Sequence, residues 1–289
     1  MKRLCVLAAM VLCLGPVSWA ARTVKDETGR TVTVPDKVNR VVSLTPSVTD
    51  TIYALGGGPQ LVAITDFTEY PPQAAREKPS IGDILHPSLE RILSFHPDVV
   101  IAVSTLNSPE TVRGLERMKI PVFLVHGRGL AGVYSAIASI GQVIGREREA
   151  AELTRKLKER EQRVRKLSEG KKKPSVFLSV QLEPCITAGS GAFITELIEA
   201  AGARSVTSDV KQDWLRISLE SVIPRNPDYI LIMKSAPFGL KEMRARAGWN
   251  ALRAVREGHV MYADDRLQIP GPVAFDGLED LAKNIEAAR

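Results

Sequence analysis

One short motif occurs twice in the sequence, each time with a glutamate near the start of a predicted helix. Ser88-Leu89-Glu90 is followed by an apolar stretch, a Pro-Asp pair and a buried strand, and Ser218-Leu219-Glu220 opens the same order. A carboxylate in the first turn of a helix is stabilised by the helix dipole by about 0.3–1 kcal/mol, and it can stay exposed. Such a pair is suited to charge pairing with a basic partner, although acidic residues are also common at helix starts for local reasons.

Residue types that usually carry catalysis or hold a metal are few and scattered. After residue 20 the chain has one cysteine, Cys185, and its four histidines never fall at the His-x-x-x-His spacing of a metal site. The sequence contains no Gly-x-Ser-x-Gly elbow and no phosphate loop, and Gly189-Ser190-Gly191 lacks the third glycine of a dinucleotide fingerprint. We therefore predict a protein that is not an enzyme and has no resident metal or cofactor. A secreted enzyme is the alternative from a different class, and contacts of Cys185, His86 or His126 with a ligand stay open.

Residues 1–20 have the pattern of a secretory signal peptide. Lys2 and Arg3 precede an apolar run, and Ser18 and Ala20 place small residues where signal peptidase cuts. The run is too short to cross about 30 Å of hydrocarbon. No lipid-attachment pattern surrounds Cys5 or Cys13. We predict a soluble, exported protein.

The net charge of +6 comes from one predicted helical segment. Between residues 146 and 173, twelve Lys or Arg face six Glu, and no aromatic side chain is interleaved for base stacking. The charges surround an apolar stripe, as on a solvated helix face. We therefore exclude nucleic acid as a partner.

Apolar strands alternate with amphipathic helices along the rest of the chain, which predicts parallel sheets covered on both faces. A hairpin is expected near residues 23–34. Strands are expected at residues 40–44, 61–65, 98–103, 121–125, 176–180, 229–233 and 259–262, and helices at residues 48–55, 89–95, 110–118, 193–201, 219–223, 249–255 and 278–288. The predicted fold class is α/β, with two Rossmann-like lobes, residues 21–129 and 171–289. A long helical bridge, residues 130–170, joins them and leaves a ligand cleft between the lobes.

Ligands of open α/β sheets bind outside the carboxyl ends of the strands. The segments that follow the predicted strands should therefore line the cleft: residues 45–47, 66–70, 104–105, 182–186 and 264–269, together with Trp214 in a predicted loop. Trp214 and Tyr70 are the sharpest candidates, because aromatic side chains are costly to expose without a partner. The alternative is that each packs beneath its own loop. The ligand-binding candidates in these segments are Pro46, Ser47, Phe67, Tyr70, Ile186, Trp214 and Arg266.

In its motifs the chain resembles the periplasmic substrate-binding proteins of ABC importers that take up vitamin B12, ferric siderophores and haem. The likeness covers nearly all of the chain after the signal peptide. It rests on stretches that occur together and in order, at residues 26–32, 40–47, 70–74, 89–92, 97–101 and 270–272. The resemblance implies a periplasmic, monomeric protein with two lobes on one long helix. Its implied partners are a small-molecule metal chelate and the membrane permease.

The resemblance also implies roles for single residues. Glu90 and Glu220 match the two glutamates, one per lobe, that dock into basic pockets of the permease. Trp214 matches an aromatic residue that packs on the corrin ring in members that bind vitamin B12, and Ile84 and Ile186 stand where those members have further aromatics. We expect a corrinoid as the ligand. A ferric siderophore is the alternative and haem a third, since no tyrosine follows Gly82 as an axial ligand.

Overall fold

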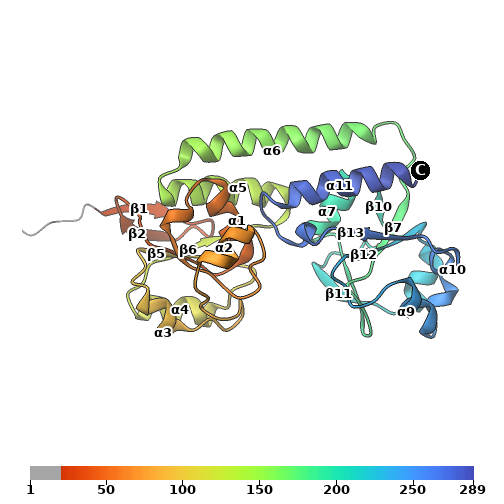
Figure 1. Ribbon diagram of the computed structural model, residues 1–289, viewed down its shortest axis with the longest axis horizontal. Helices are drawn as coiled ribbons and strands as arrows, with labels where there is room; N and C mark the ends of the chain where they lie inside the picture. The colour runs from red at the N-terminus through yellow and green to blue at the C-terminus, as the bar shows by residue number, and fades with distance from the viewer. Residues whose placement is uncertain (1–20) are drawn as a thin grey trace, which may run out of the picture.

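The computed structural model describes residues 21–289, so the predicted signal peptide, residues 1–20, lies outside the described residues. Within the described part the chain forms two α/β lobes, with one long helix running along both of them (Figure 1). No described helix combines the length and the apolar character needed to cross a membrane.

The N-terminal lobe contains a four-stranded parallel sheet in the order β4-β3-β5-β6. Its strands are buried except for the half-buried Val62, and apolar except for Ser43, as expected for a sheet covered on both faces. The hairpin is formed by β1 and β2. Element bounds are β1 Ala21–Lys25, β2 Thr31–Pro35, β3 Val41–Ser43, α1 Pro46–Ala54, β4 Leu61–Ala63, α2 Pro72–Glu77, α3 Leu89–Ser94, β5 Val99–Val103, α4 Pro109–Arg117 and β6 Val122–Val125.

The C-terminal lobe contains a second four-stranded parallel sheet, in the order β10-β7-β12-β13. It also carries a small antiparallel sheet, β11-β9-β8, where the sequence predicted loops. These strands have two to four residues, too few to show an alternating pattern. Element bounds are β7 Ser175–Leu178, β8 Gln181–Leu182, β9 Cys185–Ala188, α7 Phe193–Ala200, β10 Arg204–Ser205, β11 Trp214–Arg216, α8 Leu219–Val222, β12 Tyr229–Met233, α9 Leu240–Ala245, α10 Arg253–Glu257, β13 Val260–Ala263 and α11 Ala274–Ala287, with short 3₁₀ turns η1 Gly58–Gln60, η2 Ile223–Arg225, η3 Trp249–Ala251 and η4 Asp265–Gln268.

The connection between the lobes is a pair of helices, α5 Gly129–Ile144 and α6 Glu147–Leu167. Gly145 ends α5 in a left-handed conformation, with φ of 71°, and the chain then turns back along α5. The 21-residue α6 spans both lobes on the side away from α3 and α9 (Figure 1). Its buried stripe includes Leu157 and Val164, and its other faces carry the basic residues.

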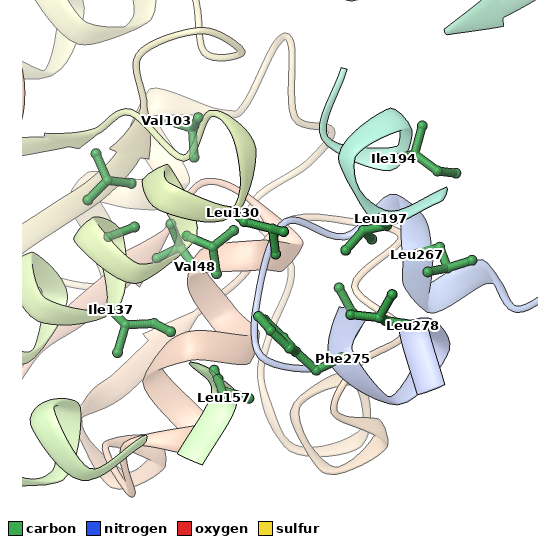
Figure 2. Close-up of a cluster of buried hydrophobic side chains, with 14 of the residues drawn as sticks. Val48, Val103, Leu130, Ile137, Leu157, Ile194, Leu197, Leu267, Phe275 and Leu278 are labelled. Carbon is green, nitrogen blue, oxygen red and sulfur yellow. The ribbon is translucent and has the colours of Figure 1, made fainter. Parts of the chain in front are cut away.

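A single apolar core continues from one lobe into the other. It contains residues of β3, β5 and α1 in the N-terminal lobe, of α5 and α6 in the bridge, and of β7, α7 and α11 in the C-terminal lobe. Figure 2 shows Leu130 and Leu157 of the bridge beside Phe275 of α11. The ring of Tyr134 on α5 lies 5.9 Å from that of Phe275. Each lobe also has a separate core on the outer face of its sheet.

Polar contacts reinforce this joint. Arg160 of α6 donates to Glu279 and Asp276 of α11, at 2.8 Å and 2.6 Å. Glu196 of α7 accepts from the backbone N–H of Leu130 in the first turn of α5, at 2.7 Å, which satisfies a donor that has no partner within its own helix.

A buried carboxylate of the N-terminal lobe sits at the start of α11. Oδ2 of Asp50 on α1 accepts from the N–H of Val273 at 2.8 Å, and the Asp50 side chain is almost fully buried. Burial raises the pKa of Asp50 to about 7, with a contribution from the charge of Asp276 and an opposing one from the Val273 N–H. The folded protein therefore binds the Asp50 proton more tightly than the unfolded chain does.

We predict that the free energy of unfolding falls as the pH rises from about 4 to about 7. The fall is up to about 1.4 kcal/mol for each pH unit over which Asp50 is ionised in the unfolded chain but still protonated in the folded protein. Asp50→Asn should flatten this dependence, because the amide oxygen still accepts from Val273 and does not titrate. The measurement is urea unfolding at pH 5 and pH 8. Asp209→Asn is the control, since Arg225 lowers the pKa of that exposed carboxyl below this window. An unchanged slope in Asp50→Asn would contradict the assignment.

Candidate functional site

A cavity of about 310 Å³ lies between the two lobes. Its size is at the lower end of the usual range for small-molecule sites. We call it the inter-lobe cavity and define it by its lining residues, which are Ser47, Val48, Thr51, Val103, Thr105, Leu106, Val125, Gly127, Arg128, Gly129, Ala136, Ile140, Gly191, Ala192, Phe193, Ile194, Asp213, Trp214, Leu267, Gln268 and Pro270.

The carboxyl ends of the N-terminal strands position one wall. After β3, the hydroxyl of Thr45 caps α1 by accepting from the N–H of Val48, and this places Ser47 at the cavity. After β5, Asn107 accepts from the N–H of Val103 and donates to the carbonyls of Leu44 and Ile84. This buried amide fixes the turn that carries Thr105 and Leu106 into the wall. The wall thus follows the strand-end rule of open α/β sheets.

The opposite wall comes from the C-terminal lobe. Trp214 is the first residue of β11, and its strand partner is Ala188 of β9. This corrects the prediction that Trp214 lies in a loop. The side chain of Trp214 is 49% exposed, and Leu106 across the cavity is 46% exposed. Two large apolar side chains therefore stay accessible on opposite lobes, where they can contact the apolar faces of a ligand.

One ion pair connects the two walls. Nη2 of Arg128, just before α5, donates to both carboxylate oxygens of Asp213, at 2.6 Å and 2.7 Å. Gly129 follows with φ of +66°, and a Cβ there would lie 2.4 Å from Oε1 of Glu196. A glycine is therefore required at this turn, both for its backbone conformation and for the approach of α7.

Of the eight predicted ligand-binding residues, the structure places Ser47 and Trp214 on the cavity wall. Pro46 begins α1 beside Ser47 without lining the cavity. Phe67 is 83% exposed in the loop after β4, with φ of 59°, a conformation that strains a bulky residue. Tyr70 is half-buried in the same loop.

The remaining three candidates also lie outside the lining residues. Ile84 is half-buried in an N-terminal loop, and Ile186 is half-buried on β9 opposite Arg216. Arg266 is engaged by three carboxylates of its own lobe, which are those of Asp264, Asp276 and Asp280. Its guanidinium is therefore occupied by intramolecular partners.

Sequence reasoning missed Arg128, Leu106, Phe193 and Asp213. Arg128 could have been found, because it follows β6 as the other predicted wall residues follow their strands. Asp213 and Phe193 could not, since they reach the cavity through the unpredicted β11–β9 sheet and through the packing of α7 on α5.

Three residues for which the sequence allowed a contact with a ligand, Cys185, His86 and His126, do not line the cavity. Cys185 is buried in the C-terminal lobe, and burial raises the pKa of its thiol to about 11, so it stays protonated at neutral pH. His86 is exposed, and Nδ1 of the exposed His126 lies 3.0 Å from Oγ of Ser104. Within residues 21–289 no group of three or more His, Cys, Asp or Glu side chains is placed to hold a metal ion.

The two repeated glutamates are exposed in the first turns of α3 and α8. Ser88 caps α3 by accepting from the N–H of Arg91 at 3.3 Å, whereas the hydroxyl of Ser218 lies 3.0 Å from that of Ser221. Neither Glu90 nor Glu220 makes a hydrogen bond or an ion pair with any residue of the described chain. Their carboxylates are therefore available to an external partner.

The family model described as periplasmic binding protein matches residues 41–267. The chain belongs to this family. This periplasmic binding protein is 29% identical to an uncharacterized ABC transporter substrate-binding lipoprotein of Bacillus subtilis. The match covers 91% of this chain and 85% of that one. It is 27% identical to a vitamin B12-binding protein of Pectobacterium carotovorum, over 67% of this chain and 70% of that one. A periplasmic haem-binding protein of Roseiflexus in its apo form superimposes with a TM-score of 0.79, at 25% identity, over 87% of this chain and all of that one.

The geometry of the cavity predicts a specific role for Trp214. Trp214→Ala should weaken the binding of any ligand that fills the inter-lobe cavity by about 1–3 kcal/mol, as the loss of a buried aromatic contact does. Isothermal titration calorimetry measures the effect without depending on tryptophan fluorescence. The matched control is Tyr262→Ala, which removes an aromatic side chain that is 47% exposed in the same lobe but does not line the cavity. Equal affinities for the protein and both variants would place the ligand elsewhere.

Proposed function

We propose that this periplasmic binding protein captures a metal chelate in the inter-lobe cavity and delivers it to the membrane permease of an ABC importer. The chelate we propose is vitamin B12 or another corrinoid. The proposal includes export by the signal peptide, without a lipid anchor, and action as a monomer. It includes no catalytic step.

The observation that carries the proposal is the composition of the cavity. Apolar and small side chains dominate it, Trp214 and Leu106 face it from opposite lobes, and a single ion pair supplies its charges. Such a surface suits a ligand that is held mainly by apolar contact and a few hydrogen bonds. Among the relatives, one named as a vitamin B12-binding protein matches two thirds of the chain.

The residues that line the cavity also favour some of the alternative ligands over others. The cavity is lined by no histidine, tyrosine, cysteine or methionine, which are the side chains that usually ligate haem iron. A chelate whose metal is already fully coordinated, as in a corrinoid or a ferric siderophore, fits better than haem. Arg128 is the one basic residue among the lining residues, so a siderophore with several negative charges would lack partners. A ferric siderophore of low charge is the second candidate.

Titration of the purified protein tests the ligand. Cyanocobalamin, a ferric hydroxamate siderophore and haem are each added in separate experiments, and binding is followed by calorimetry and by absorbance. We expect saturable binding of cyanocobalamin with one molecule per chain. Saturable binding of the siderophore or of haem, with none of cyanocobalamin, would replace the corrinoid by that ligand.

Docking to the permease is proposed for Glu90 and Glu220. They are exposed, without partners in residues 21–289, and each opens the corresponding helix of its lobe. Exposed charges of this kind set the register and specificity of an interface more than they stabilise the protein that carries them. Replacing Glu90 and Glu220 should leave ligand affinity unchanged, since neither residue lines the cavity.

The double variant Glu90→Ala, Glu220→Ala should therefore lose most of its transport activity. Its ligand affinity and thermal stability should stay nearly unchanged, because exposed charges contribute about 0–1 kcal/mol to stability. Each single variant should be intermediate, and reversal to Arg should be worse than Ala. The measurement is cobalamin uptake by the reconstituted importer, with binding to the isolated protein in parallel.

Glu152→Ala, Glu159→Ala is the matched control. It removes the same charge from exposed positions on α6, which lies on the side of the molecule away from α3 (Figure 1). Full uptake with the Glu90, Glu220 double variant would contradict the docking role. Each glutamate would then serve only the start of its own helix.

A further inference from the structure

The ion pair between Arg128 and Asp213 is the one charged feature of the residues that line the inter-lobe cavity. Arg128 stands between β6 and α5, and Asp213 directly precedes β11. The pair therefore joins the wall of the N-terminal lobe to that of the C-terminal lobe. A charge at a mostly apolar cavity has a direct effect on which ligands can enter it.

This pair is easily opened. The Arg128 side chain is 54% exposed and that of Asp213 is 38% exposed, and ion pairs this exposed contribute little to stability. Both contacts use the same nitrogen of Arg128, in place of the two-nitrogen fork that guanidinium groups form with carboxylates. In the described chain, Nε and Nη1 of Arg128 have no hydrogen-bond partner. The guanidinium thus keeps donors for a second anion.

Asp213 is the fixed member of the pair. Its carbonyl accepts from the N–H of Gly189 at 3.0 Å, and the next residue, Trp214, begins the strand paired with β9. Its carboxylate lies over Gly191, where a Cβ would stand 2.2 Å from Oδ1. Arg128, by contrast, holds its charge on a long side chain with several rotatable bonds. Exchange of partners therefore means that the guanidinium moves and Asp213 stays.

We propose that Arg128 selects ligands that present a carboxylate to the inter-lobe cavity, and that Asp213 holds the guanidinium until such a carboxylate replaces it. This inference rests on the proposed function, because it takes the cavity as the ligand site. Asp213 has two effects in this arrangement. It keeps Arg128 oriented in the empty protein, and it disfavours anionic ligands by competing for the guanidinium and by like-charge repulsion.

The test compares two probes that differ by one charge. The first is cobalamin, and the second is cobalamin with one side-chain amide hydrolysed to a carboxylate, each positional isomer being titrated separately by calorimetry. For at least one isomer, Asp213→Asn should improve the affinity of the carboxylate form relative to the amide form by about tenfold, since the competing carboxylate is gone. Arg128→Gln should lower the same ratio by about tenfold, and Arg128→Lys should recover part of the loss because it keeps the charge.

Asp209→Asn serves as the matched control. Asp209 pairs with Arg225 in the same lobe, at 2.5 Å, away from the lining residues, and its removal should leave the ratio unchanged. A purely structural role for Arg128 would weaken both probes equally in Arg128→Gln, and that result would overturn the inference. A ratio that is the same for every isomer in the wild type, in Asp213→Asn and in Arg128→Gln would also overturn it. If neither probe binds the wild type, the corrinoid function fails first and this inference fails with it.

Discussion

The two lobes are held by one continuous apolar core, and the position of every group in the inter-lobe cavity depends on it. α5 packs against α1 of one lobe and α7 of the other, and α6 contacts both α5 and α11. Phe275 lies where these elements meet (Figure 2). Because protein interiors are close-packed, a change of angle between the lobes would require this core to be repacked. Lobes joined by a flexible strand pair have no such restriction.

Under the proposed function, such a joint lets a cavity with few polar groups be selective. The distance between Trp214 and Leu106 is set by the shared core, and binding does not have to spend free energy on bringing the walls together. The contacts that cross the cavity itself are weak and exposed, as in the pair of Arg128 and Asp213. The strong contacts, among them the guanidinium of Arg160 with Glu279, lie at the back of the joint. A ligand can therefore replace cavity contacts without disturbing the lobes.

Much of this arrangement could be predicted from the sequence, since two α/β lobes and a helical bridge follow from long, strongly periodic segments. The small β11-β9-β8 sheet could not, because each strand is only two to four residues long. Because this sheet was not predicted, Trp214 was expected in a loop, and Asp213 was not recognised as a cavity residue. Arg266 was a reasonable candidate by its position after β13, but three carboxylates engage it, that of Asp264 just before η4 and those of Asp276 and Asp280 on α11. Pairing that depends on how η4 packs against α11 has no local sequence pattern.

Equilibrium unfolding followed separately in each lobe tests the shared core most directly. The described tryptophans, Trp214 and Trp249, both report on the C-terminal lobe. A dye on a cysteine introduced at Glu110, which is 74% exposed on α4, reports on the N-terminal lobe, since Cys185 is buried and resists labelling. A shared core predicts one cooperative transition, with the same midpoint and slope from both probes. Two separate midpoints would show that the lobes are independent units and that the core between them does not fix the cavity.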